Sequence, residues 1–127
     1  MTAGEARCAL TRVVAFHATH SYTNCGPMAP HGHLYRVEVR VSRTLAAGES
    51  AVIDLSLLDQ ILTDEITDCL AGRHVNDVTE MNREPTCEAI ASWCWQRIAP
   101  RLPAMVLLEQ VRVAEDGTLW ADCTGVD

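Results

Sequence analysis

Apolar and polar residues alternate in two stretches near the start of the chain, and this pattern predicts two β-strands. Within residues 8–16, one face of the first strand would carry Cys8, Leu10, Val14 and Phe16. From His33 the alternation is strict, with Tyr35, Val37, Val39 and Val41 on one face and charged residues on the other. Because successive side chains point to opposite faces, the second strand is expected to lie half-buried in an antiparallel sheet. Residues 18–32, which include Ser, Asn, two Gly and two Pro, predict a long loop between the two strands.

The apolar spacing changes to three and four residues in the middle of the chain, which is typical of an amphipathic helix. Residues 54–70 follow this period, and Asp54 or Ser56 is expected to cap the start of the helix. A second helix is expected from about 86 to 99, directly after Pro85.

The C-terminal part of the chain predicts a β-hairpin. Residues 105–114 form one β-like run, Asp116-Gly117 is typical of a tight hairpin turn, and residues 118–123 form the last strand. The expected order is therefore β-β-α-α-β-β, an α+β fold with two helices on one face of an antiparallel sheet. Such a subunit leaves the other face and two sheet edges uncovered, so we expect a homo-oligomer.

The composition is that of a single folded domain over residues 1–127. Hydrophobic residues make up 48% and charged residues 21%, which favours a packed core over disorder. Apolar runs such as residues 105–108 are far too short to span a bilayer, and the N-terminus does not resemble a secretory signal. We therefore expect no membrane partner.

Charge and cysteine usage exclude further classes. A net charge of −7 argues against a general nucleic-acid binder. All ten basic residues are Arg, so Schiff-base chemistry on a lysine and a Walker-type phosphate lysine are excluded. Six cysteines without a C-x-x-C pair or a signal peptide favour reduced thiols in a cytoplasmic protein over a disulfide framework.

Three histidines form a candidate metal site. His31 and His33 are two apart where the second strand begins, so both imidazoles would point to one side if the strand already includes them. His20 on the preceding loop could supply a third nitrogen, and three neutral imidazoles with an open fourth position suit a catalytic zinc ion. The alternative is that these are loop histidines without a common role.

Three other residues are candidates for chemistry, each with a plainer interpretation. Cys25 falls between His20 and His31, where a cation and imidazoles would lower the pKa of its thiol; alternatively it is an inert buried cysteine. Glu115 precedes the Asp-Gly turn and could equally be a solvated hairpin charge. Glu88 lies in the first turn of the second helix, where a carboxylate suits the helix dipole regardless of function.

An ordered set of motifs covers essentially the whole chain. They are Phe16-His-Ala-Thr-His20, Cys25 followed by His31-Gly-His33 and Tyr35, Val52-Ile-Asp54-Leu, Val75-Asn76-Asp77, Pro85-Thr86-Cys-Glu88 and Val111-Arg-Val-Ala-Glu115. Together they resemble the 6-pyruvoyltetrahydropterin synthase and 6-carboxytetrahydropterin synthase family. The resemblance implies the tunnelling fold (T-fold), in which β-β-α-α-β-β subunits form an oligomeric barrel, a hexamer or a tetramer, with active sites between subunits.

The resemblance also implies roles for individual residues. His20, His31 and His33 match the zinc ligands, and Cys25 matches the catalytic thiol. Glu115 matches the carboxylate that anchors the pterin ring. Thr86 and Glu88 match supporting contacts to that ring. The five residues between Cys25 and His31 resemble the pyruvoyl synthases, whereas the carboxy synthases typically have three.

The chain departs from the family pattern at one place. Where the family has Leu-Asp-His, this chain has Leu70-Ala71-Gly72, so the Asp-His pair that shuttles a proton is missing in register. His74 follows two residues later and could supply an imidazole if the local backbone is rearranged. An acid–base pair contributes roughly 10² to 10⁴ in rate, so a changed reaction is conceivable.

Three functions follow as hypotheses. The first is a zinc-dependent lyase that acts on a pterin-like substrate, with 7,8-dihydroneopterin triphosphate as the family model and an arginine such as Arg36 or Arg73 meeting the phosphates. The second is a diverged enzyme that uses zinc and thiol for an aldol-type, cyclisation or elimination step in another biosynthetic pathway. The third is a non-enzymatic module that binds zinc or a pterin.

Overall fold

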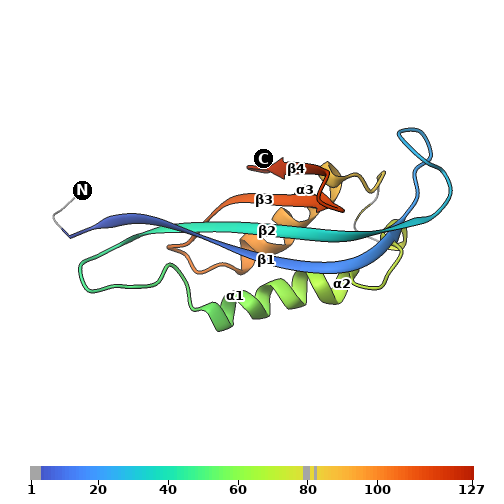
Figure 1. Cartoon of the computed structure of the whole chain (residues 1–127). Coiled ribbons are helices and arrows are strands. Elements are labelled where there is room, and N and C mark those ends of the chain that lie inside the picture. The colour runs from blue at the N-terminus through green and yellow to red at the C-terminus, as the bar shows by residue number, and fades with distance from the viewer. Residues whose placement is uncertain (1–3, 79–80, 82) are drawn as a thin grey trace.

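The computed structural model describes residues 4–78, 81 and 83–127. Its strands form one antiparallel sheet in the order β1-β2-β3-β4 (Figure 1). The strands are β1 (Ala6–His20), β2 (His31–Leu45), β3 (Leu107–Glu115) and β4 (Leu119–Cys123). The helices are α1 (Leu55–Leu62), α2 (Asp68–Leu70) and α3 (Cys87–Ile98), with short 3₁₀ turns at Val75–Asp77 and Ala99–Arg101. The expected β-β-α-α-β-β order is confirmed.

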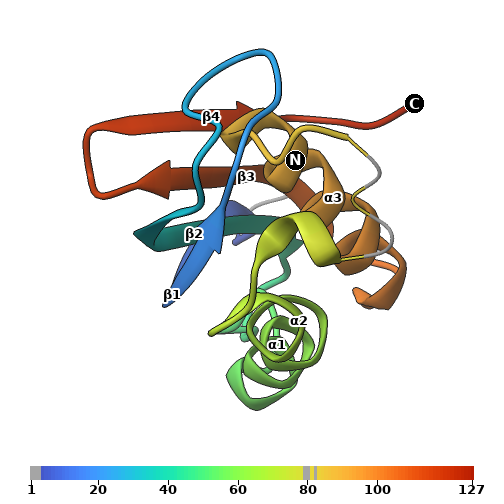
Figure 2. The same cartoon turned by 90° about the vertical axis from the view of Figure 1, so that its right-hand side faces the viewer.

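All helices lie on one side of the sheet, and the core fills the space between (Figure 2). Val37, Val39 and Val41 of β2 are fully buried, as the strict alternation predicted. They meet the buried residues of α1 and α3, among them Leu58 and Ile90. Fully burying one such side chain contributes about 1.5–3 kcal/mol, so this shared face holds the two layers together.

The helix predicted over residues 54–70 is present, with a wide π-turn at Thr63–Thr67 that joins α1 to α2. Asp54 caps it, because its Oδ1 accepts from the N–H of Ser56 at 2.8 Å. At the π-turn, the carbonyl of Glu65 accepts from Nε of Arg97 on α3, which ties the two helices together.

The predicted loop over residues 18–32 is wrong at both ends. β1 continues to His20 and β2 begins at His31, so the loop comprises only residues 21–30. Cross-strand pairing causes the extension: Ala18 lies opposite His33, and His20 lies opposite His31. His20 is therefore a strand residue on the buried face rather than a loop residue.

Two local features shape the end of the sheet that carries the histidines. Asp116 and Gly117 have φ of 50° and 76°, which confirms the tight turn between β3 and β4. At the opposite edge of the sheet, along β1, the N–H of Gly72 donates to the carbonyl of His17 at 2.7 Å. The segment after α2 therefore runs along the edge of β1. Within residues 4–78, 81 and 83–127, no helix reaches the length and apolar character needed to span a bilayer.

Candidate metal centre

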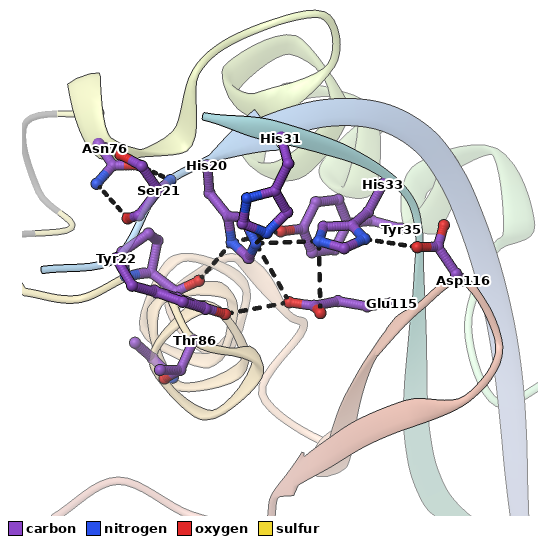
Figure 3. Close-up of polar contacts among 12 residues, drawn as sticks. His20, Ser21, Tyr22, His31, His33, Tyr35, Asn76, Thr86, Glu115 and Asp116 are labelled. Atoms are coloured by element: carbon purple, nitrogen blue, oxygen red, sulfur yellow. Dashed lines mark hydrogen bonds and ion pairs between the residues drawn. The ribbon is translucent and has the colours of Figure 1, made fainter. Parts of the chain in front are cut away.

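Three imidazoles converge where β1 ends and β2 begins (Figure 3). Nε2 of His20 lies 2.9 Å from Nε2 of His31 and 3.1 Å from Nε2 of His33. The antiparallel register produces this, because His20 and His31 are direct partners and His33 shares the face of His31. His20 is fully buried, and the other two are half-buried. The structure thus brings together the three histidines predicted as ligands.

The outward nitrogen of each ring is held by an oxygen of the protein. Nδ1 of His20 lies 3.1 Å from the carbonyl of Pro85, and Nδ1 of His31 lies 2.9 Å from the carbonyl of Ala29. Nδ1 of His33 lies 2.5 Å from Oδ2 of Asp116. Carbonyls and carboxylates only accept, so we assign the proton of each ring to Nδ1. Three Nε2 lone pairs then face one another.

That arrangement fits a bound cation. Metal-ligating histidines donate their other N–H to a carbonyl or carboxylate, which fixes the tautomer and orients the ring. Burial lowers the pKa of His20 and so favours the neutral ring that a metal needs. Without a cation, the close lone pairs repel one another; with one, all three become ligands.

Glu115 adds a negative charge beside the three rings. It is the last residue of β3 and is only 7% exposed, which rules out the plainer interpretation of a solvated hairpin charge. Its carboxylate oxygens lie 3.8 Å from Nε2 of His20 and 3.7 Å from Nε2 of His33. The hydroxyl of Tyr22 donates to the same carboxylate at 3.4 Å. A buried carboxylate needs such partners, and it would balance a bound cation.

Cys25 lies in the exposed loop 21–30, and its pKa departs from the expectation. Loss of solvent contact and the charges of Glu84 and Glu88 raise the pKa of the thiol. The prediction of a lowered pKa relied on neighbouring imidazoles. Among the described residues, no hydrogen bond joins Cys25 to the three histidines, and the groups that act on the thiol are carboxylates.

The remaining predicted residues lie around the site rather than within it. Thr86 caps α3 by accepting from the N–H of Ala89 at 3.1 Å, and Glu88 is exposed in the first turn. Nδ1 of His74 lies 2.9 Å from Oγ1 of Thr19. Thr19 points to the opposite face of β1 from His20, so the structure does not bring His74 to the imidazoles.

The sequence interpretation missed several neighbours of the rings. Tyr35 was assigned to the core, yet its hydroxyl lies 2.9 Å from Nδ1 of His20. Asp116 was assigned only to the turn, although its carboxylate holds His33. Burial, together with the charge of the neighbouring Glu115, raises the pKa of Cys87 to about 12, so this thiol stays protonated. The period of β2 could have indicated Tyr35, because it shares a face with His33.

The sequence matches the family described as 6-pyruvoyl tetrahydropterin synthase over residues 9–126. The chain belongs to this family. Family membership supports a lyase of the pterin-synthase type. A search of the curated proteins found no significant match.

Solved structures of low sequence identity share the fold. The Caenorhabditis elegans 6-pyruvoyl tetrahydropterin synthase superposes with a TM-score of 0.83 at 19% identity, over 95% of this chain and 97% of that one. A Plasmodium vivax synthase, described as a mutant of a catalytic residue, gives 0.74 at 16% identity, over 93% and 97%. An uncharacterized protein from Wolinella succinogenes gives 0.74 at 16%, over 95% and 99%. These likenesses confirm the T-fold subunit.

Proposed function

We propose that the protein is a zinc-dependent lyase of the 6-pyruvoyltetrahydropterin synthase type that acts on the side chain of 7,8-dihydroneopterin triphosphate or a related pterin. The observation that carries the proposal is the convergence of three Nε2 atoms beside the Glu115 carboxylate. Family membership supports a pterin as the substrate class. When bound, zinc supplies a Lewis acid that acidifies the side-chain hydroxyls of the substrate and stabilises charge on oxygen.

The choice of zinc rests on the donor set. His20, His31 and His33 would hold the ion through Nε2, and three neutral imidazoles leave a position for water or substrate. Nitrogen ligands also suit copper, iron and nickel, so metal analysis is part of the test.

The proposed thiol chemistry uses Cys25 as the base. Its thiolate would remove a carbon-bound proton of the substrate, and the electron pair left on carbon would expel triphosphate as the carbon–oxygen bond breaks. For carbon–carbon cleavage the base would instead remove a side-chain hydroxyl proton, and the electron pair of that O–H bond would form a carbonyl as the carbon–carbon bond breaks. Return of the proton needs an acid. Ala71 and Gly72 carry no titratable group. We assign this step in part to His74, which lies beside Thr19 on the opposite face of β1 from His20 and would therefore pass the proton through a water molecule.

An arginine beside the site would meet the phosphates. Arg73 lines a surface cavity of about 400 Å³ together with His33 and Asp116, so this cavity adjoins the imidazoles. Arg36 lines a cavity of about 280 Å³ beside Trp120, further along the sheet. Because Arg73 and His33 line the same cavity, we favour Arg73 as the residue that meets the phosphates.

Incubation of the purified, zinc-loaded protein with 7,8-dihydroneopterin triphosphate tests the proposal directly. We expect turnover, with triphosphate or a shortened side chain as product. Absence of turnover would contradict the proposal and favour a diverged reaction, and tight binding of the pterin without turnover of any candidate substrate would favour the non-enzymatic binding module.

The second candidate is a diverged lyase or aldol-type enzyme with another substrate. The specific observation in its favour is Gly72, where the family has a catalytic imidazole. Its φ is +71°, and a Cβ built there meets no described atom within 4 Å. An open space replaces a side chain at this point.

Glu115 is expected to bind the pterin ring through adjacent N–H groups, with Thr86 and Glu88 in support. Glu115→Gln keeps the shape but replaces an accepting oxygen with a donor. Binding of a pterin should weaken by about 1.5–3 kcal/mol, as measured by calorimetry. Unchanged affinity, with zinc content unaltered, would mean that the ring binds elsewhere.

We also propose that the active protein is a homo-oligomer. Figure 2 shows one face of the sheet free of helices, and Val13, Leu34 and Trp120 are 40%, 42% and 53% exposed on that subunit. Light scattering at micromolar concentration should return a hexamer or tetramer, because association covers this face and the edges of β1 and β4. A monomer would contradict the prediction.

A further inference from the structure

The loop that carries Cys25 is held at two points by side chains from distant segments. Asn76 forms a pair of hydrogen bonds with the backbone of Ser21, both 2.9 Å long (Figure 3). Oε1 of Glu84 accepts from the N–H of Thr23 at 2.7 Å, from its hydroxyl at 2.7 Å and from the N–H of Asn24 at 2.9 Å. One carboxylate oxygen therefore collects three donors immediately before Cys25.

Glu84 also begins a segment that reaches the imidazoles. The next residue, Pro85, supplies the carbonyl that lies 3.1 Å from Nδ1 of His20. Thr86 then caps α3, and its own N–H donates to the carbonyl of Glu84 at 2.9 Å. Three consecutive residues thus fix the Cys25 loop, one candidate metal ligand and the start of a helix.

The far side of the loop packs on the same site. A Cβ at Gly26 would clash with the ring of Tyr22, so the backbone beside Cys25 lies directly against that ring. The Tyr22 ring centroid lies 4.6 Å from that of His20. The loop is therefore connected to His20 by two routes, through Tyr22 and through Glu84 with Pro85.

We propose that Glu84 is a positioning residue that fixes the Cys25 thiol relative to the three histidines. This inference rests on the proposed function, in which Cys25 is the base. Hydrogen bonds to a carboxylate are stronger than those between neutral groups, so an ionised Glu84 suits this task. The donors of Thr23 and Asn24 lower the pKa of Glu84 and keep it ionised.

The same charge has an opposite effect on the thiol. Together with loss of solvent contact, the charges of Glu84 and Glu88 raise the pKa of Cys25, and Tyr22 is a further titratable group beside it. Glu84 therefore holds the Cys25 loop in place but disfavours the thiolate that the proposed reaction needs. Removal of its charge should favour the thiolate, whereas removal of its oxygen should release the loop.

Two substitutions separate these effects. Glu84→Gln keeps an accepting oxygen for the three donors but removes the charge. Glu84→Ala removes both. Glu49→Ala is the matched control, because Glu49 likewise accepts from a loop N–H, that of Ala46 at 2.8 Å, and lies in the loop after β2. The readouts are hydrogen exchange of the amides at 23 and 24, the pH profile of Cys25 alkylation by iodoacetamide, and turnover.

We expect Glu84→Gln to keep amide protection and turnover while alkylation of Cys25 begins at lower pH. Glu84→Ala should lose amide protection and turnover, retain bound zinc, and show the same shift in alkylation. Glu49→Ala should match the unchanged chain in all three readouts. If Glu84→Ala keeps amide protection, the inference is overturned. If the unchanged chain never turns over the pterin but Glu84→Ala still releases the loop, the proposed function fails and the role of Glu84 in positioning the loop stands.

Discussion

A chain that carries His31→Ala should purify without zinc, whereas the unchanged chain should hold about one ion per subunit. The substitution leaves two Nε2 donors and opens a second coordination position, beside the one that is already open to water or substrate. Loss of an outer-shell partner alone costs about 10- to 100-fold in metal affinity, and loss of a ligand should cost more. His31 is half-buried, whereas His20 is fully buried, so removal of His31 disturbs the core less than removal of His20 would. Elemental analysis after dialysis measures the outcome.

His17→Ala is the matched control for this experiment. His17 precedes His20 by three residues in β1 but is exposed on the opposite face of the strand. Its removal takes one imidazole from the same strand and should leave zinc content unchanged. Full zinc occupancy in His31→Ala, with normal thermal unfolding in both variants, would contradict the metal assignment.

Much of the fold was predictable because each element buries one face. The period of two in β2 and of three to four in α1 follows from contact with a single core, so Val39 and Leu58 reveal their elements locally. Asp116-Gly117 likewise carries its own turn signal. The sequence therefore predicts these strands, helices and this turn, because residues within each element determine its backbone.

The contacts around the metal site were less predictable because they depend on cross-strand register and on distant segments. The apolar alternation of β1 stops before His20, so the hydrophobic pattern does not indicate the pairing of His20 with His31 that aligns the imidazoles. Asp116 reaches His33 only because β3 pairs with β2. Glu84 lies about sixty residues from the loop that it holds, and so its effect on the Cys25 pKa had no local signal.

Replacement of Cys25 by Ala should abolish turnover and leave zinc content intact. The exposed thiol lies outside the set of converging nitrogen atoms, so its loss removes the proposed base without removing a ligand. General base catalysis contributes about 10² to 10⁴ in rate, and turnover should fall by at least that much. Because the thiol pKa is raised, activity should increase as pH rises toward the thiolate form. Steady-state assays across pH, with zinc analysis of each variant, measure both effects.

His74→Ala provides the comparison that separates proton removal from proton return. Its ring is held by Thr19 on the other face of β1, so the loss of His74 should slow turnover by a smaller factor than the loss of Cys25. Cys87→Ala controls for thiol loss as such, because Cys87 is buried and its pKa of about 12 keeps it protonated. Full activity in Cys25→Ala would reject the thiol as base. If His74→Ala keeps full turnover while Cys25→Ala is inactive, proton return must come from water or Glu88. That result would favour the diverged reaction, because no side chain of this segment would then substitute for the family's imidazole at Gly72, where the space for a side chain is open.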